Sequence, residues 1–224
     1  ANEKQVQIKT ISSFHEGKHH RIYKVDTNLP DKSLILRIPY NIDPSKTISN
    51  RIKSEVATMD YVSTKLGIKT PNVYMYSTNA SNPVGAPFIL EEFIDGELLM
   101  RQWDPLCEDE VDNRPPEKLK KVIDIVADFH GKLNSVQFNT VGSIYFKEDV
   151  DPKILNDKAT EIIDDRWVIG PVMERSFWRK KNGISGEVDN YLGPWKGKNG
   201  SVSEIIENLG IVEHENAKGR ASLI

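Results

Sequence analysis

The chain has 224 residues, with 30 lysines and arginines against 33 aspartates and glutamates, which gives a formal net charge of −3. This near balance offers no basic surface to a phosphate backbone, so we expect no nucleic-acid partner. Hydrophobic residues make up 38% of the chain but form no run near the ~18 residues that cross a bilayer, so we expect a soluble protein without a transmembrane segment.

The length and a change of residue pattern predict two domains. At ~100–200 residues per domain, the chain allows one large domain or two small ones. The sequence changes from strand-rich to helical near Asp95, so we place one domain in residues 1–94 and another in 95–224, with a loop-rich insertion at about 140–200. The single cysteine, Cys107, excludes an internal disulfide and favours a reducing compartment. Because the sequence starts with Ala1, we also expect residues upstream to be missing.

The first part of the chain predicts three strands. Residues 6–26 form two of them around a polar turn, because apolar and polar residues alternate in the second strand. The third covers residues 33–38, in which alternate side chains belong to opposite faces. Ile35 and Arg37 share one face, which places a charged group in a strand otherwise suited to burial.

A helix and two further strands follow. Apolar residues recur at three- and four-residue steps between Asp43 and Gly67, and Gly67 is a suitable C-terminal cap. Glu55 lies beside this apolar stripe. Strands at 73–76 and 87–94 come next, joined by a turn rich in Asn, Ser, Pro and Gly. The order predicts an α+β fold, with a five-stranded antiparallel sheet and one inserted helix.

The second part of the chain predicts helices. A long helix opens at Pro115-Pro116, and its apolar residues line one side. A last helix begins at the capping box Ser201–Glu204 and carries its apolar residues on one face. A one-sided apolar helix needs a partner, so we expect either a protein partner or the rest of a mainly helical, incomplete C-terminal lobe to cover it.

The turn near residue 17 is a candidate phosphate-binding element. With Gly17 at its tip, backbone N–H groups could approach phosphate oxygens, and Lys18 could add positive charge. The turn has a single glycine, so an ordinary hairpin explains the same residues.

Arg37 and Glu55 are candidates for an ion pair between a strand and the following helix. In kinase-like sites such a pair fixes a cation against the nucleotide phosphates. Arginine suits this role because it is always charged and binds bidentately. The alternative is a solvated surface pair of little energetic weight.

The order of these elements matches the nucleotide-binding lobe of kinase-like proteins. The matching stretches are Glu16–Val25, Leu36–Pro39, Glu55, Leu66–Gly67, Thr70–Pro71, Phe88–Glu97, Gly142–Phe146, Ile169–Pro171 and Gly193–Trp195. In these stretches and their order, the chain resembles the aminoglycoside phosphotransferase family and, within it, the fungal altered-inheritance-of-mitochondria protein 9 group.

This resemblance implies a kinase-like, ATP-dependent phosphotransferase. The turn at Gly17–Lys18 would cover the phosphates of ATP, Arg37 would hold them, and Glu55 would orient Arg37. Glu92 and Ile94 would offer backbone C=O and N–H groups to adenine, where a plain edge strand is the alternative. The partners would be a nucleotide and a phosphoryl acceptor that the sequence does not identify, and the location would be mitochondrial.

The catalytic residues of the resembling family are not found in this sequence. That family has a His-Gly-Asp loop, a nearby Asn and a second Asp that binds Mg²⁺. His130-Gly131-Lys132 lacks the carboxylate that would act as base, and it continues an apolar helical stripe. No cluster of Cys and His indicates a metal site. We therefore expect the catalytic residues and Mg²⁺ ligands beyond Ile224, and no phosphoryl transfer by this chain alone.

Two other interpretations stay open at this point. A catalytically inactive kinase-like protein could serve as a binding or scaffold protein of mitochondria, and would keep Arg37 and Glu55 as structure. A plain α+β interaction domain explains the composition equally well but gives no reason for the order of the motifs.

Overall fold

The structure is a computed structural model of the chain. It describes residues 6–29, 32–43, 45–96, 117–173 and 193–196. Of the last predicted helix it describes five separate residues, all helical: Ile206, Glu207, Gly210, Ile211 and His214. The capping box at 201–204 and the segment 97–116 lie outside the described residues.

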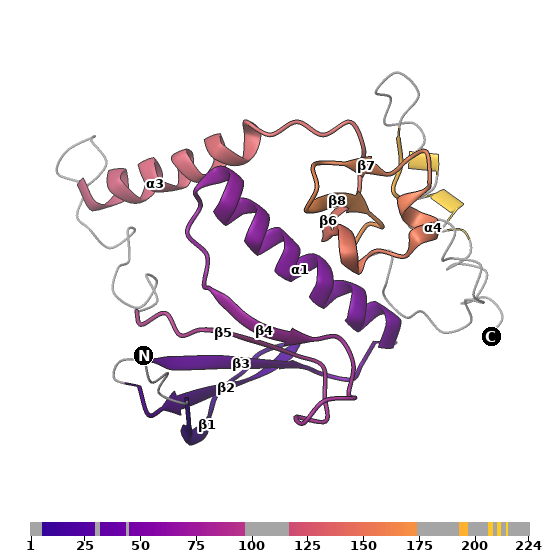
Figure 1. Cartoon of the computed structure of the whole chain (residues 1–224). Coiled ribbons are helices and arrows are strands. Elements are labelled where there is room, and N and C mark those ends of the chain that lie inside the picture. The colour runs from indigo at the N-terminus through magenta and orange to yellow at the C-terminus, as the bar shows by residue number, and fades with distance from the viewer. Residues whose placement is uncertain are drawn as a thin grey trace.

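A five-stranded antiparallel sheet forms the first layer (Figure 1). Its strands are β1 (Ile8–Glu16), β2 (His20–Thr27), β3 (Ser33–Pro39), β4 (Val73–Ser77) and β5 (Phe88–Glu92). Their order in space is β1-β2-β3-β5-β4, with every neighbouring pair antiparallel. The helix α1 (Ser45–Leu66) connects β3 to β4. The sequence prediction of an α+β fold, with one helix inserted in a five-stranded antiparallel sheet, is confirmed.

The helix α1 packs on the face of this sheet that carries Ile35 and Arg37. Strand register places Ile35 opposite Glu91 and Arg37 opposite Ile89, so these four residues share a face. The buried cluster between helix and sheet consists of Ile48, Ile52, Val56 and Ile89. As predicted, Gly67 follows the end of α1 at Leu66, and its positive φ of 62° is a conformation that favours glycine.

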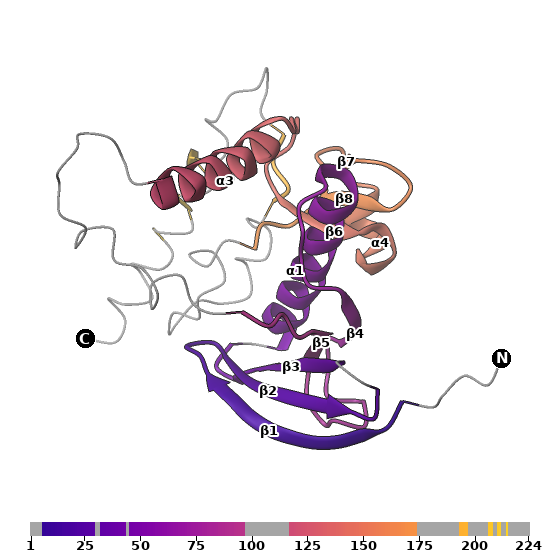
Figure 2. The ribbon, with the colours of Figure 1, turned by 90° about the vertical axis from the view of Figure 1, so that its left-hand side faces the viewer.

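The next described helix, α3 (Glu117–Asn134), lies apart from the five-stranded sheet in both views of the ribbon (Figure 2). It includes His130, which confirms that the His-Gly-Lys sequence belongs to a helix. Its apolar side is largely exposed among the described residues, with Ile123 51% and Phe129 42% accessible. None of the described helices is long and apolar enough to span a membrane.

A second, three-stranded sheet lies within the region predicted to be loop-rich. It consists of β6 (Ser143–Phe146), β7 (Glu161–Ile162) and β8 (Trp167–Gly170), in the order β6-β8-β7. Two short helices, η1 (Lys147–Asp149) and α4 (Pro152–Leu155), lie between β6 and β7. These strands have two to four residues, too few to show a clear alternation of side chains.

The second sheet packs against the side of α1 that faces away from the first (Figure 1). Trp167 of β8 is 2% exposed and packs with Ala57 and Tyr61 of α1. The rings of Tyr61 and Trp167 meet edge to face, 5.4 Å apart. Thus α1 lies between two sheets, and residues 143–170 fix its position from the outer side.

Candidate functional site

The structure brings the predicted pair Arg37 and Glu55 into direct contact. Nη2 of Arg37 lies 2.6 Å from Oε1 of Glu55. The side chain of Arg37 is only 17% exposed and that of Glu55 31%, so this is a partly buried pair rather than a solvated one. It forms because the apolar residues of α1 pack on Ile89 of β5, which lies opposite Arg37 in the sheet, so Glu55 of the helix meets Arg37.

A second carboxylate, Glu91 of β5, holds the same arginine. Nε of Arg37 lies 3.0 Å from Oε1 of Glu91, and Nη2 donates a hydrogen bond of 3.1 Å to Oε2. Glu91 is buried, with 8% exposure. Sequence reasoning missed this residue. Glu91 lies two positions after Ile89 in β5, so the two residues share a face, and this spacing could have pointed to Glu91. However, only the pairing with β3 shows which of the adjacent Glu91 and Glu92 faces α1.

One guanidinium therefore balances two carboxylates, and the cluster has one negative charge in excess. Burial disfavours the charged guanidinium, but the charges of Glu55 and Glu91 outweigh it and raise the pKa of Arg37. Burial and the nearby charge of Glu55 raise the pKa of Glu91, although Arg37 opposes them. The charged form of Glu91 is thus held in an unfavourable environment.

The β1–β2 hairpin places Lys18 and His19 at its tip, not Gly17. The backbone N–H of Gly17 donates a 2.9 Å hydrogen bond to the carbonyl oxygen of His20, which closes the turn. This N–H group is therefore not available to a phosphate, and the expected position of Gly17 at the tip was wrong. Lys18 is exposed. That the turn covers phosphates stays a prediction, which now rests on the backbone of Lys18 and His19.

His20 is a further residue at the site that the sequence did not indicate as one. It begins β2 opposite Pro39. Its pKa lies below the ordinary value of 6.5, mainly because of burial and also because of Arg37 and Arg51, while Glu55 opposes the shift. Because its pKa is lowered, the imidazole of His20, which lies near the Arg37–Glu55 pair, is mostly neutral at neutral pH.

Glu92 and Ile94 lie at and beyond the end of β5. The Glu92 carboxylate accepts hydrogen bonds from the backbone N–H (3.2 Å) and side-chain amide (2.8 Å) of Asn72, which ties β5 to the segment before β4. Ile94 is 59% exposed. Between them, the ring of Phe93 lies beneath the Lys24 ammonium, 4.3 Å from it. Backbone contact of Glu92 and Ile94 with adenine stays a prediction.

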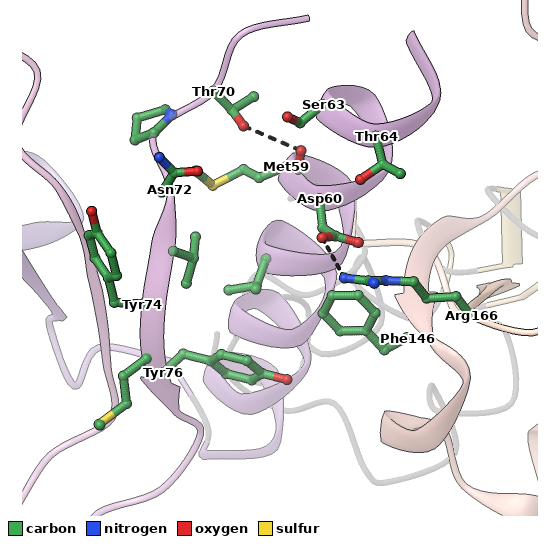
Figure 3. Close-up of a pocket in the computed structure, with 14 residues that line it drawn as sticks. Met59, Asp60, Ser63, Thr64, Thr70, Asn72, Tyr74, Tyr76, Phe146 and Arg166 are labelled. Atoms are coloured by element: carbon green, nitrogen blue, oxygen red, sulfur yellow. Dashed lines mark hydrogen bonds and ion pairs between the residues drawn. The ribbon is translucent and has the colours of Figure 1, made fainter. Parts of the chain in front are cut away.

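A separate pocket of about 480 Å³ lies beside α1, between this helix, β4 and the second sheet (Figure 3). Asp60 of α1 and Arg166 meet at its edge, with Oδ1 and Nη2 2.6 Å apart. Tyr76 of β4 donates a hydrogen bond of 3.0 Å to Asp149. These contacts connect α1 and β4 to the second sheet, and the pocket lining includes no predicted site residue.

No group of three or more His, Cys, Asp or Glu side chains in the described ranges is arranged to hold a metal ion. Of the predicted site residues, the structure brings Arg37 and Glu55 into contact, and Glu91 and His20 are neighbours of this pair that the sequence did not predict.

Curated fungal proteins match nearly the whole chain. Three of them carry the name "Altered inheritance of mitochondria protein 9, mitochondrial". The identity is 49% over 229 aligned positions with the protein of Zygosaccharomyces rouxii and 50% over 241 with that of Candida glabrata. It is 47% over 223 positions with the protein of Lachancea thermotolerans. The chain is a homologue of these proteins.

The alignments cover 99%, 98% and 97% of this chain but 36%, 37% and 36% of the three relatives, so the chain spans little more than a third of their length. No family model and no solved structure matches the chain. These relatives support the resemblance to the altered-inheritance-of-mitochondria protein 9 group. The resemblance to the aminoglycoside phosphotransferase family and the kinase-like fold stays a prediction.

Proposed function

We propose that this chain forms the nucleotide-binding part of an ATP-dependent phosphotransferase. One observation carries the proposal: Arg37, on the central strand β3, is paired at 2.6 Å with Glu55 of the inserted helix. A strand cation fixed by a helix carboxylate is the arrangement that orients nucleotide phosphates in kinase-like sites. Its partial burial matters because a phosphate–guanidinium contact is stronger where water is excluded.

The other predicted residues have roles around this pair. The backbone of Lys18 and His19 at the hairpin tip covers the phosphates, together with the Lys18 ammonium. The end of β5, at Glu92 and Ile94, receives adenine. Mg²⁺ and the catalytic groups belong to residues beyond 224, so the chain alone is expected not to transfer a phosphoryl group. The phosphoryl acceptor is not assigned.

We also propose that the chain works in mitochondria. Its fungal relatives carry the word mitochondrial in their names and align with at least 97% of it. Import of a tagged full-length protein into isolated mitochondria, followed by protease protection, tests this location. A signal confined to the supernatant would contradict it.

Titration of the purified chain with MgATP tests the nucleotide site. We expect Arg37→Gln to weaken binding by about tenfold or more, because a charge-assisted contact to phosphate is lost. Arg21→Gln is the matched control: Arg21 pairs with Glu16, is 49% exposed, and lies opposite Ile38 on the other face of the sheet. Inorganic tripolyphosphate, titrated in parallel, separates phosphate binding from adenine binding. Equal affinity of wild type and Arg37→Gln would contradict the assignment.

A second candidate is an inactive binding or scaffold protein of mitochondria. The contact of Glu91 with Arg37 favours it, because that carboxylate occupies donors that a phosphate would need. A folded chain that binds neither MgATP nor tripolyphosphate would support this second function and exclude the first.

A further inference from the structure

Glu91 and Glu55 do not hold Arg37 in the same way. Glu55 approaches Nη2, at 2.6 Å. Glu91 faces both Nε and Nη2, at 3.0 and 3.1 Å, which is the side-on edge of the guanidinium. Phosphate groups bind arginine through pairs of parallel N–H donors such as this edge. Glu91 therefore spans both donors of an edge that a phosphate would need, whereas the contact of Glu55 is with one of these donors, Nη2.

Glu91 does not satisfy both hydrogen-bond donors of that edge. The Nε–H group of Arg37 is buried and makes no well-aligned hydrogen bond with any described residue, although Oε1 of Glu91 lies 3.0 Å away. A buried donor without an aligned acceptor is costly, and a better-placed oxygen would satisfy it. The geometry thus leaves Nε suited to an incoming anion and weakens the hold of Glu91.

The net charge of Arg37, Glu55 and Glu91 also makes Glu91 a competitor of an incoming phosphate. With two carboxylates around one guanidinium, an approaching triphosphate meets a net negative charge rather than a positive one. The buried Glu91, 8% exposed, supplies the surplus. Burial and Glu55 raise its pKa, which agrees with a carboxylate whose charge the folded protein disfavours.

We propose that Glu91 is an electrostatic latch on the nucleotide site, which holds Arg37 in the unliganded protein and releases it when a triphosphate binds. This inference rests on the proposed function. The two carboxylates then have opposite effects: Glu55 positions Arg37 and supports binding, whereas the charge of Glu91 competes with the phosphates and lowers affinity.

Isothermal titration of the purified chain with MgATP and with inorganic tripolyphosphate tests the latch. Glu91→Gln keeps the size of the side chain and one acceptor oxygen but removes its charge, so we expect both ligands to bind about tenfold more tightly. Glu55→Gln is the matched variant on the same arginine, and we expect it to bind no more tightly than wild type. Glu91→Asp retains the charge and should not show the gain. Thermal unfolding of each variant establishes that it is folded.

The outcomes separate the latch from the nucleotide site itself. If wild type binds MgATP through Arg37 but Glu91→Gln binds no more tightly, the latch is wrong and the nucleotide site stands. If neither wild type nor Glu91→Gln binds either ligand, both proposals are overturned. A gain for Glu91→Gln that Glu55→Gln reproduces would also overturn the latch, because the effect would then follow from net charge alone. Tighter tripolyphosphate binding by Glu91→Gln alone supports the latch even if adenine adds nothing.

Discussion

The two sides of α1 are built in different ways. Toward the second sheet, the helix presents Ala57 and Tyr61, which pack on Trp167, while the ion pair Asp60–Arg166 lies at the margin. Toward the five-stranded sheet, apolar packing surrounds a partly buried group of three charged side chains, Arg37, Glu55 and Glu91. On the outer side the arginine, Arg166, is 56% exposed and pairs with one carboxylate, whereas on the inner side Arg37 is 17% exposed and contacts two, which leaves one negative charge in excess.

This difference suggests that the outer side of α1 anchors the helix, whereas the inner side positions charged side chains for a ligand. Burial of apolar surface stabilises the fold directly, whereas a buried ion pair does so only when its geometry is good enough to offset the desolvation penalty. The outer side therefore fits an anchoring role. Perturbed charges enclosed in one place are more common at functional sites than elsewhere, which is why the inner side is the better candidate for ligand binding.

The largest predicted effect concerns the apolar anchor. Trp167→Ala removes a ring that is 2% exposed and in contact with Ala57 and Tyr61, so we expect a loss of about 3–5 kcal/mol in the free energy of unfolding. Chemical denaturation measures it. Trp167→Phe should lose much less, since it keeps an aromatic ring and removes the indole N–H, which is buried without a hydrogen-bond partner among the described residues.

Ile125→Ala is the control for this experiment. Ile125 lies on α3 and is 69% exposed, so its truncation should change stability by less than about 0.5 kcal/mol. A similar loss for Trp167→Ala and Ile125→Ala would mean that the second sheet does not anchor α1.

The next effect concerns the enclosed charges. Arg37→Gln leaves Glu55 and Glu91 without their shared cation, and we expect a loss of roughly 2–4 kcal/mol, because an unpaired buried charge is more costly than a lost contact. The double variant Arg37→Gln, Glu91→Gln removes one carboxylate as well and should recover part of this loss. Urea denaturation of the three proteins gives both values. If the double variant is no more stable than Arg37→Gln, repulsion between the carboxylates is not the cause.

The sequence predicted the first layer of the fold well because its signals are local. The helix α1 has 22 residues with a regular apolar period, and strands of five to nine residues show alternation or clear turn boundaries. The contact between Arg37 and Glu55 could be predicted for the same reason, since both lie in elements whose period fixes their faces.

The missed features depend on contacts between distant parts of the chain. Trp167 packs on Ala57, so nothing near either residue in sequence indicates the second sheet. The contribution of Glu91 depends on the register between β3 and β5, whose paired residues are more than 50 positions apart. The error at Gly17 had a local cause. One hydrogen bond to His20 decides which residues form the tip, and the turn sequence allows more than one register.

A smaller effect is expected from the pH dependence of Glu91. Its folded-state pKa is raised above the ordinary 4.5, so the folded protein favours the protonated form. The stability that protonation provides is complete below pH 4.5 and is lost as the pH rises through the raised pKa. Glu91→Gln mimics the protonated form, so we expect it to melt at a higher temperature than wild type at pH 7 and at nearly the same temperature at pH 4.

Scanning calorimetry from pH 4 to 7 measures this difference. Arg37 and His20, whose pKa values are also shifted in the folded protein, are present in both proteins, so their contribution largely cancels in the comparison. A difference that grows toward pH 4 would reverse the sign and show that Glu91 stabilises the fold as a charged group.

The smallest effect concerns the ion pair at the edge of the pocket beside α1 (Figure 3). Arg166 and Asp60 approach to 2.6 Å, but the arginine side chain is 56% exposed, so solvent and salt screen the pair. We expect Arg166→Ala to lower the free energy of unfolding by at most about 1 kcal/mol, with a smaller loss at 1 M salt. The guanidinium also lies 5.2 Å from the ring of Trp167, and this contact is less sensitive to salt. A loss that salt leaves unchanged would therefore assign Arg166 to the apolar anchor, whereas a loss above 2 kcal/mol would show that charge contributes to the outer side of α1 as it does to the inner.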